Sequence, residues 1–165
     1  MMPTNQAAAG EFNKEEFLAG KQIVAFESPR DHYHADAAVV WCFDDRFSKV
    51  LEAFLEARSI QHTDLISIAG GLKTLASPDS EDDRLFVLNQ IKASIALHHT
   101  PMAYLMVHSD CGKYGGLETF GGDESKELEH YRLEAKKAED FLKAHLDPSV
   151  RVISLFADFA GVWQL

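Results

Sequence analysis

His108, Cys111 and Cys42 are the residues of this chain best suited to chemistry at a metal. His108 and Cys111 stand three positions apart, at the end of an apolar run that begins at Met102. Cys42 ends a second apolar run, which begins at Ala37. Thiolates and imidazoles are ligands that zinc prefers, and three protein ligands leave the fourth tetrahedral position open, as in catalytic sites. The sequence therefore predicts a catalytic zinc site held by Cys42, His108 and Cys111.

The loop after Cys42 adds a carboxylate and a guanidinium, Asp44 and Arg46, two positions apart. An arginine can hold a carboxylate through two parallel hydrogen bonds. A carboxylate fixed in this way could orient a zinc-bound water, or it could bind the metal itself. Asp45, between them, can be a solvated loop acid. Asp44 and Arg46 are therefore our candidate catalytic residues.

Other interpretations of these residues stay open. Two cysteines are often ordinary core residues, and a single His-x-x-Cys motif is a weak signal. A disulfide between Cys42 and Cys111 is also geometrically possible, but it would leave His108 and Asp44 without a role. The joint occurrence of these residues at the ends of predicted strands favours the metal.

The elements that must position these residues alternate between strands and helices. Apolar runs predict strands, and amphipathic periodicity predicts helices. Strands are expected at 37–42, 64–68, 102–108 and 150–156, with a short last strand after a turn at 158–163, and helices at 47–58, from Ser77 to about His98, and at 124–145. Such alternation implies parallel strands joined by right-handed crossovers.

The expected fold is therefore α/β. It has a central, mostly parallel sheet of about four strands, a short antiparallel strand at the C-terminal edge and helices on both faces. Because parallel strands expose the same end of a sheet, Cys42, His108 and Cys111 can meet in one crevice.

Composition excludes several function classes. The chain has 165 residues, of which 46% are hydrophobic, and this is enough apolar material for the core of one domain. Its formal net charge of −10 makes it too acidic for a surface that binds nucleic acid. The sequence contains no run of 18 apolar residues, so it predicts no membrane span. The N-terminus lacks the basic and apolar regions of a secretory signal, so a cytoplasmic location is expected.

We expect residues 1–11 to be a disordered lead-in and residues 12–165 to form a single domain. Residues 12–26 are compatible with an amphipathic helix interrupted by Gly20.

At the metal-site residues the chain resembles the β-class carbonic anhydrases, whose pattern is Cys-x-Asp-x-Arg followed later by His-x-x-Cys-Gly. The matching residues are Cys42, Asp44, Arg46, His108, Cys111 and Gly112. The segments 69–71 and 156–161 also resemble the family, so the likeness spans roughly residues 37–165 and is strongest to its short members. The chain departs from the family at Ser67-Ile68, where Arg-Asn is usual, and at residues 113–116, which are unlike the usual helical continuation.

The resemblance implies a carbonic anhydrase-like lyase (carbonate dehydratase), in which zinc-bound hydroxide converts carbon dioxide reversibly to bicarbonate. It also implies a homodimer or larger homo-oligomer, with the N-terminal helix packed on the partner. Relatives act on carbonyl sulfide or carbon disulfide, so the same site with either substrate is an alternative, as is a non-catalytic zinc-binding role. Phe43 or Tyr114 could line the substrate pocket. His98 and His99 could carry protons, although surface histidines at a helix end are the simpler interpretation.

Overall fold

The computed structural model describes residue 13, residue 17 and residues 19–165. The chain divides into two units, Met1–His32 and Tyr33–Leu165. In the first unit, residues 19–32 contain no helix or strand, so the expected helix over 12–26 is absent from residues 19–26. Ala19 has a left-handed φ of 46°, and Gly20, which follows it, is a poor helix former. The expected lead-in at 1–11 and most of residues 12–18 lie outside the described residues.

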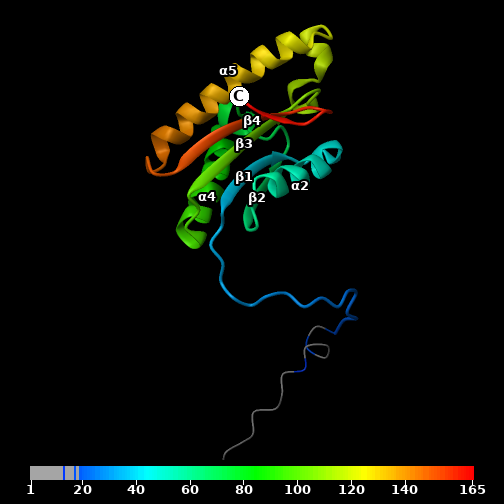
Figure 1. Ribbon diagram of the computed structural model, residues 1–165, viewed down its shortest axis with the longest axis vertical. Helices are drawn as coiled ribbons and strands as arrows, with labels where there is room; N and C mark the ends of the chain where they lie inside the picture. The colour runs from blue at the N-terminus through cyan, green and yellow to red at the C-terminus, as the bar shows by residue number, and fades with distance from the viewer. Residues whose placement is uncertain (1–12, 14–16, 18) are drawn as a thin grey trace, which may run out of the picture. The chain divides into compact units, whose positions relative to one another are not determined.

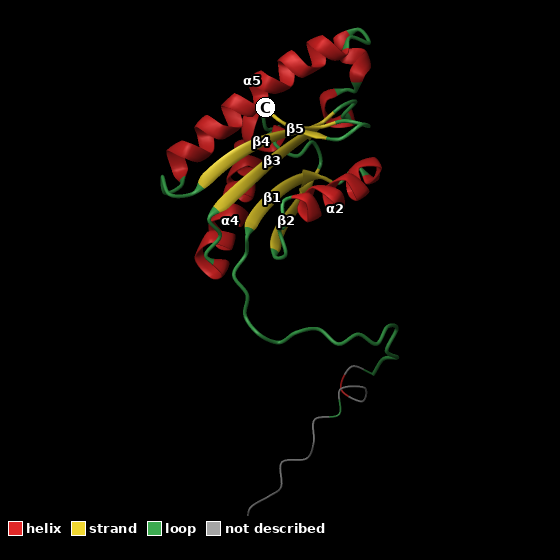
Figure 2. Ribbon diagram, viewed as in Figure 1, coloured by secondary structure: helices red, strands yellow, loops and turns green. Residues whose placement is uncertain are grey.

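Within residues 33–165 the protein is built on one five-stranded sheet with the order β2-β1-β3-β4-β5 (Figure 2). The strands are β1 (Ala37–Cys42), β2 (Thr63–Ile68), β3 (Met102–His108), β4 (Arg151–Ala157) and β5 (Val162–Gln164). The first four are parallel to one another, and β5 pairs antiparallel with β4. The α/β fold predicted from the sequence, including its antiparallel C-terminal edge, is therefore confirmed.

Helices follow the strands as the pattern predicts. They are η1 (Asp45–Phe47), α2 (Ser48–Ala57), α3 (Lys73–Ala76), α4 (Glu81–His98), η2 (Gly112–Tyr114), η3 (Leu117–Phe120) and α5 (Glu124–His145). The start of α4 is shifted from Ser77, because the Ser80 hydroxyl accepts the Asp83 N–H and caps the helix there. After Cys111 the chain forms the short 3₁₀ helices η2 and η3. None of the helices among the described residues is long and apolar enough to cross a membrane.

Alternate residues of the central strands face opposite sides of the sheet, and each side has its own core. Figure 1 shows α2 on one side and α4 and α5 on the other. Under α3, α4 and α5 lie Val40, Ala103, Leu105 and Val107; under α2 lie Val39, Trp41, Tyr104 and Met106. Because β1 is buried on both faces, its sequence is a continuous apolar run rather than an alternating one.

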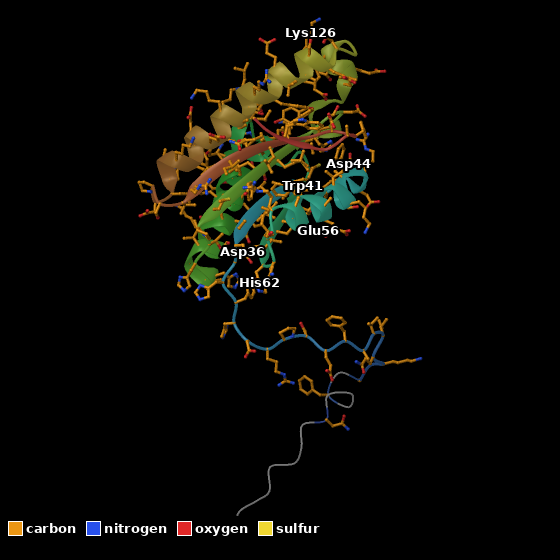
Figure 3. The ribbon with its side chains drawn as sticks, viewed as in Figure 1. Asp36, Trp41, Asp44, Glu56, His62 and Lys126 are labelled. Carbon is orange, nitrogen blue, oxygen red and sulfur yellow. The ribbon has the colours of Figure 1, made fainter. Side chains whose placement is uncertain are left out.

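The strand order makes the carboxyl ends of β1 and β3 the natural site of the fold. The chain leaves β1 towards β2 on one side and leaves β3 towards β4 on the other, and ligands bind in α/β proteins at such a switch point. Figure 3 shows Asp44 at this edge and Asp36 and His62 at the opposite edge. Gly71 closes the turn after β2 over this edge. A Cβ there, at φ 55°, would lie 2.1 Å from the Met106 carbonyl oxygen.

Candidate metal centre

The structure brings the three predicted ligands together at the carboxyl ends of β1 and β3. Ligand atoms of Cys42, His108 and Cys111 all lie within 4.8 Å of one another, and all three residues are buried. Among the described residues this is the one group of His, Cys, Asp or Glu side chains with spacing suited to a metal ion. The three side chains expected to meet at the parallel strand ends are therefore close together.

The ring of His108 is oriented for ligation by a backbone contact. Its Nδ1 lies 2.8 Å from the Ser109 carbonyl oxygen, and a carbonyl accepts, so Nδ1 carries the proton. Nε2 is then a lone-pair donor, and it is buried without a hydrogen-bond partner. An orphaned acceptor of this kind is costly inside a protein unless something binds it. The Nε2 of His108 is therefore the atom offered to a metal.

The two cysteines are free thiols, and each shifts the pKa of the other. The neighbouring Cys111 thiol lowers the pKa of Cys42, and the Gly70 N–H, 3.3 Å from Cys42 Sγ, adds to that effect. Conversely, the Cys42 thiolate raises the pKa of Cys111. Burial alone would lower the pKa of His108, but the Cys42 thiolate, the Ser109 carbonyl and the Asp44 carboxylate together outweigh burial and raise it. A bound dication would stabilise both thiolates, as zinc does in sulfur sites.

Asp44 and Arg46 form the ion pair that the sequence predicts. The Arg46 Nε lies 3.0 Å from Asp44 Oδ1, and Nη2 lies 2.6 Å from Oδ2. This guanidinium holds the pKa of Asp44 below its usual range. Asp44 Oδ2 lies 3.9 Å from His108 Nε2, beside the donor cluster. The Asp44 carboxylate is therefore ionised, bound by the Arg46 guanidinium and adjacent to the cluster that would bind a metal.

Two acids that sequence reasoning missed support the same loops. Asp110 receives the other side of the Arg46 guanidinium, with Nη1 to Oδ2 at 3.0 Å. Glu127, from α5, is buried and accepts hydrogen bonds from the Ser109 hydroxyl at 2.9 Å and the Asp110 N–H at 2.7 Å. Asp110 could have been found because it lies inside the His-x-x-Cys motif. Glu127 gave no signal, because α5 is rich in acids on all sides.

Aromatic side chains line one side of the cluster. The Phe47 ring packs on His108 with centroids 4.3 Å apart, and Phe159 packs on Phe47 at 5.3 Å. Phe43 is 68% exposed, next to the cluster in sequence. Tyr114, the other expected pocket residue, instead packs against the core and donates to Glu134 at 3.2 Å.

The histidine pair considered for proton transfer lies elsewhere. His98 Nδ1 pairs at 2.8 Å with Asp64, near the start of β2. His99 follows it at the end of α4. Both residues therefore sit at the amino edge of the sheet, opposite the metal cluster, and the surface-histidine interpretation fits their position.

Comparison with known proteins identifies the family of this chain. A family model described as "Putative carbonic anhydrase" matches residues 33–165. The chain belongs to this family. No curated protein matches the sequence. The match covers both motif segments, the one from Cys42 to Arg46 and the one from His108 to Gly112.

Solved structures share the fold at low sequence identity. A β-carbonic anhydrase from Trichomonas vaginalis has a TM-score of 0.56 at 15% identity, covering 85% of this chain and 87% of that one. A carbonic anhydrase from Streptococcus mutans has a TM-score of 0.51 at 15% identity, covering 90% and 89%. A carbon disulfide hydrolase has a TM-score of 0.50 at 14% identity, covering 80% and 79%. The fold is therefore that of the β-carbonic anhydrases.

The residues present fit the zinc ion that β-carbonic anhydrases use. Two thiols and one imidazole form a donor set typical of catalytic zinc, in which the protein supplies three ligands. A dication would give the unpartnered Nε2 of His108 a partner, and it would stabilise the thiolates of both Cys42 and Cys111. Cys42, His108 and Cys111 would hold it.

Proposed function

We propose that this protein catalyses the zinc-dependent, reversible hydration of carbon dioxide to bicarbonate, as a carbonate dehydratase. The observation that carries the proposal is the buried Cys42, His108 and Cys111 cluster with the Asp44–Arg46 pair beside it. Zinc bound there would supply the Lewis acidity that makes water nucleophilic near neutral pH. The family to which the chain belongs supports this reaction.

In this proposal each residue of the candidate site has one role. Cys42, His108 and Cys111 bind the metal. Asp44, ionised beside them, accepts a hydrogen bond from the attacking water and orients its lone pair towards the carbon of carbon dioxide. Arg46 keeps Asp44 in place. The Phe47 ring, packed on His108, makes the surroundings of the cluster apolar, which suits a substrate without charge or dipole. The reaction consumes one water and one carbon dioxide and yields bicarbonate and one proton, which buffer removes.

The test is zinc content and carbon dioxide hydration rate measured on one preparation. We expect about one zinc per chain, by the three-ligand argument, together with stopped-flow hydration that a chelator abolishes. Zinc without hydration between about pH 6 and 9, the range in which zinc activates water, would instead indicate a non-catalytic zinc-binding relative. Absence of zinc from a folded preparation would refute the proposal.

A second candidate keeps the metal site and changes the substrate to carbon disulfide or carbonyl sulfide. The likeness of the fold to a carbon disulfide hydrolase favours it, because a shared fold does not fix a substrate. Sulfide release from either compound, alongside slow carbon dioxide hydration, would establish this candidate.

Replacing Asp44 with Ala should lower turnover between about 10- and 100-fold, the usual cost of losing a group that orients a metal site's chemistry. Zinc content should stay near that of the unaltered protein, because Asp44 is not among the three donors. Asp45→Ala is the matched control, since Asp45 is exposed and one position away. Unchanged turnover in Asp44→Ala would show that the carboxylate has no part in the reaction.

We also propose that the protein is a homodimer or larger homo-oligomer. The support is the family resemblance together with Phe43 and Phe159, both 68% exposed near the candidate site, since exposed aromatic side chains often mark an interface. Light scattering that gives the mass of one chain would refute it.

A cytoplasmic location and a single domain spanning residues 12–165 also remain proposals. Two free thiols in a metal-binding arrangement suit a reducing compartment. Residues 33–165 of that domain match the family. Fractionation of cells and limited proteolysis would test these two points.

A further inference from the structure

Arg46 is held between two carboxylates that come from different loops. On one side its Nε and Nη2 contact Asp44 in the loop after β1. On the other side Nη1 contacts Asp110 Oδ2 at 3.0 Å, and Nη2 contacts the Asp110 carbonyl oxygen at 3.1 Å. All three guanidinium nitrogens are therefore engaged, although the Arg46 side chain is 44% exposed.

Hydrogen bonds hold both the backbone and the side chain of Asp110 in place. Its N–H donates to the buried Glu127 carboxylate at 2.7 Å. Its Oδ1 accepts the Leu117 N–H at 2.9 Å. Its φ is 55°, in the left-handed region that residues other than glycine seldom adopt. Uncommon backbone conformations of this kind persist where the surrounding structure enforces them, and they cluster at functional sites.

From this geometry we propose that Asp110 is a positioning residue of the metal centre. It anchors the far side of Arg46, and Arg46 in turn holds Asp44 beside the donor cluster. An exposed arginine paired with one acid can swing together with it, because both side chains have rotational freedom. A second acid on another loop removes that freedom. The inference rests on the proposed function, since it assigns Asp110 to the Asp44–Arg46 pair of that site.

Two substitutions separate the carboxylate from the backbone strain. Asp110→Asn keeps the size of the side chain and tolerates a left-handed φ, but it loses the charge that faces Arg46. Asp110→Gly removes the side chain and relieves the strain, so a loss of function there cannot come from strain. For both variants we expect unchanged zinc content and a fall of about tenfold in kcat, the usual effect of an outer residue that supports a metal site. KM should change little.

A second readout does not depend on turnover. Azide binding to the Co²⁺-loaded protein, followed by visible absorption, should weaken about tenfold in both variants. The reason is that a released Asp44, whose Oδ2 lies 3.9 Å from His108 Nε2, can compete with an anion at the cluster. If Asp110 acts through Arg46, adding either substitution to Arg46→Ala should cause no further loss in kcat or azide affinity.

The control is Ser59→Gly, which places glycine at a similar φ of 54° in an exposed turn after α2. It should leave both readouts unchanged. Effects of Asp110 and Arg46 that simply multiply in the azide measurement would overturn the proposal, even in a highly active enzyme. If the unaltered protein hydrates no carbon dioxide, the proposed function fails, and the azide measurement still tests the link between Asp110 and Arg46.

Discussion

Replacing His108 with Ala is expected to remove zinc from the protein and to reduce carbon dioxide hydration by more than about 1,000-fold. Zinc lowers the pKa of a bound water to about 7, and none of the chain's own groups at this site can substitute for that effect. His108 supplies the one nitrogen of the donor set, and its Nε2 has no other partner. Two thiols alone are a poor site for zinc, which is usually held by three or four protein ligands.

The variant should still fold, because the two cores on either side of the sheet are built from apolar side chains and need no metal. Far-ultraviolet circular dichroism, elemental analysis and stopped-flow hydration on the same sample would check this. His62→Ala is the control, since His62 lies at the opposite edge of the sheet (Figure 3). A His108→Ala protein that retains one zinc per chain would show that the assigned ligand set is wrong. Unaltered protein treated with a chelator should match the variant in activity.

The strands and the ligand set could be read from the sequence for one shared physical reason. A central parallel strand is buried on both faces, so β1 and β3 appear as uninterrupted apolar runs, and the first polar or reactive residue after each run marks its carboxyl end. Cys42 and His108 are those residues. The rule that parallel strands present their ends at one edge then brings them together.

The residues that support the site could not be read in the same way. Glu127 lies on α5, and the sequence pattern predicts a surface helix there. In the structure one face of α5 is buried and carries Glu127, Tyr131 and Glu134 alongside small apolar residues. Hydrophobic periodicity in the sequence does not reveal a buried carboxylate. Glu127 is buried because donors from a distant loop, Ser109 and Asp110, satisfy it there. Such pairings arise only when the chain is folded.

Replacing Glu127 with Ala should therefore destabilise the protein by about 3 kcal/mol, because it leaves buried donors without an acceptor. Glu127 is 1% exposed. Its carboxylate accepts three hydrogen bonds: the Ser109 hydroxyl at 2.9 Å, the Asp110 N–H at 2.7 Å and the Tyr131 hydroxyl at 3.0 Å. No water can easily replace it in a packed core. Urea unfolding would measure the loss as a lower midpoint with an unchanged slope.

Glu127→Gln should cost less, about 1 kcal/mol, because its carbonyl oxygen still serves Asp110 and Tyr131 while the Ser109 hydroxyl can turn to accept the new amide. Glu129→Ala is the matched control on the same helix. Glu129 is exposed, so its loss should change stability by no more than about 0.5 kcal/mol. If Glu127→Ala cost no more than Glu129→Ala, the buried carboxylate would not be what ties α5 to the loop between His108 and Cys111. The ranking has a physical basis: Ala leaves three buried donors without an acceptor, Gln replaces charge-assisted hydrogen bonds with weaker neutral ones, and the control loses no buried partner.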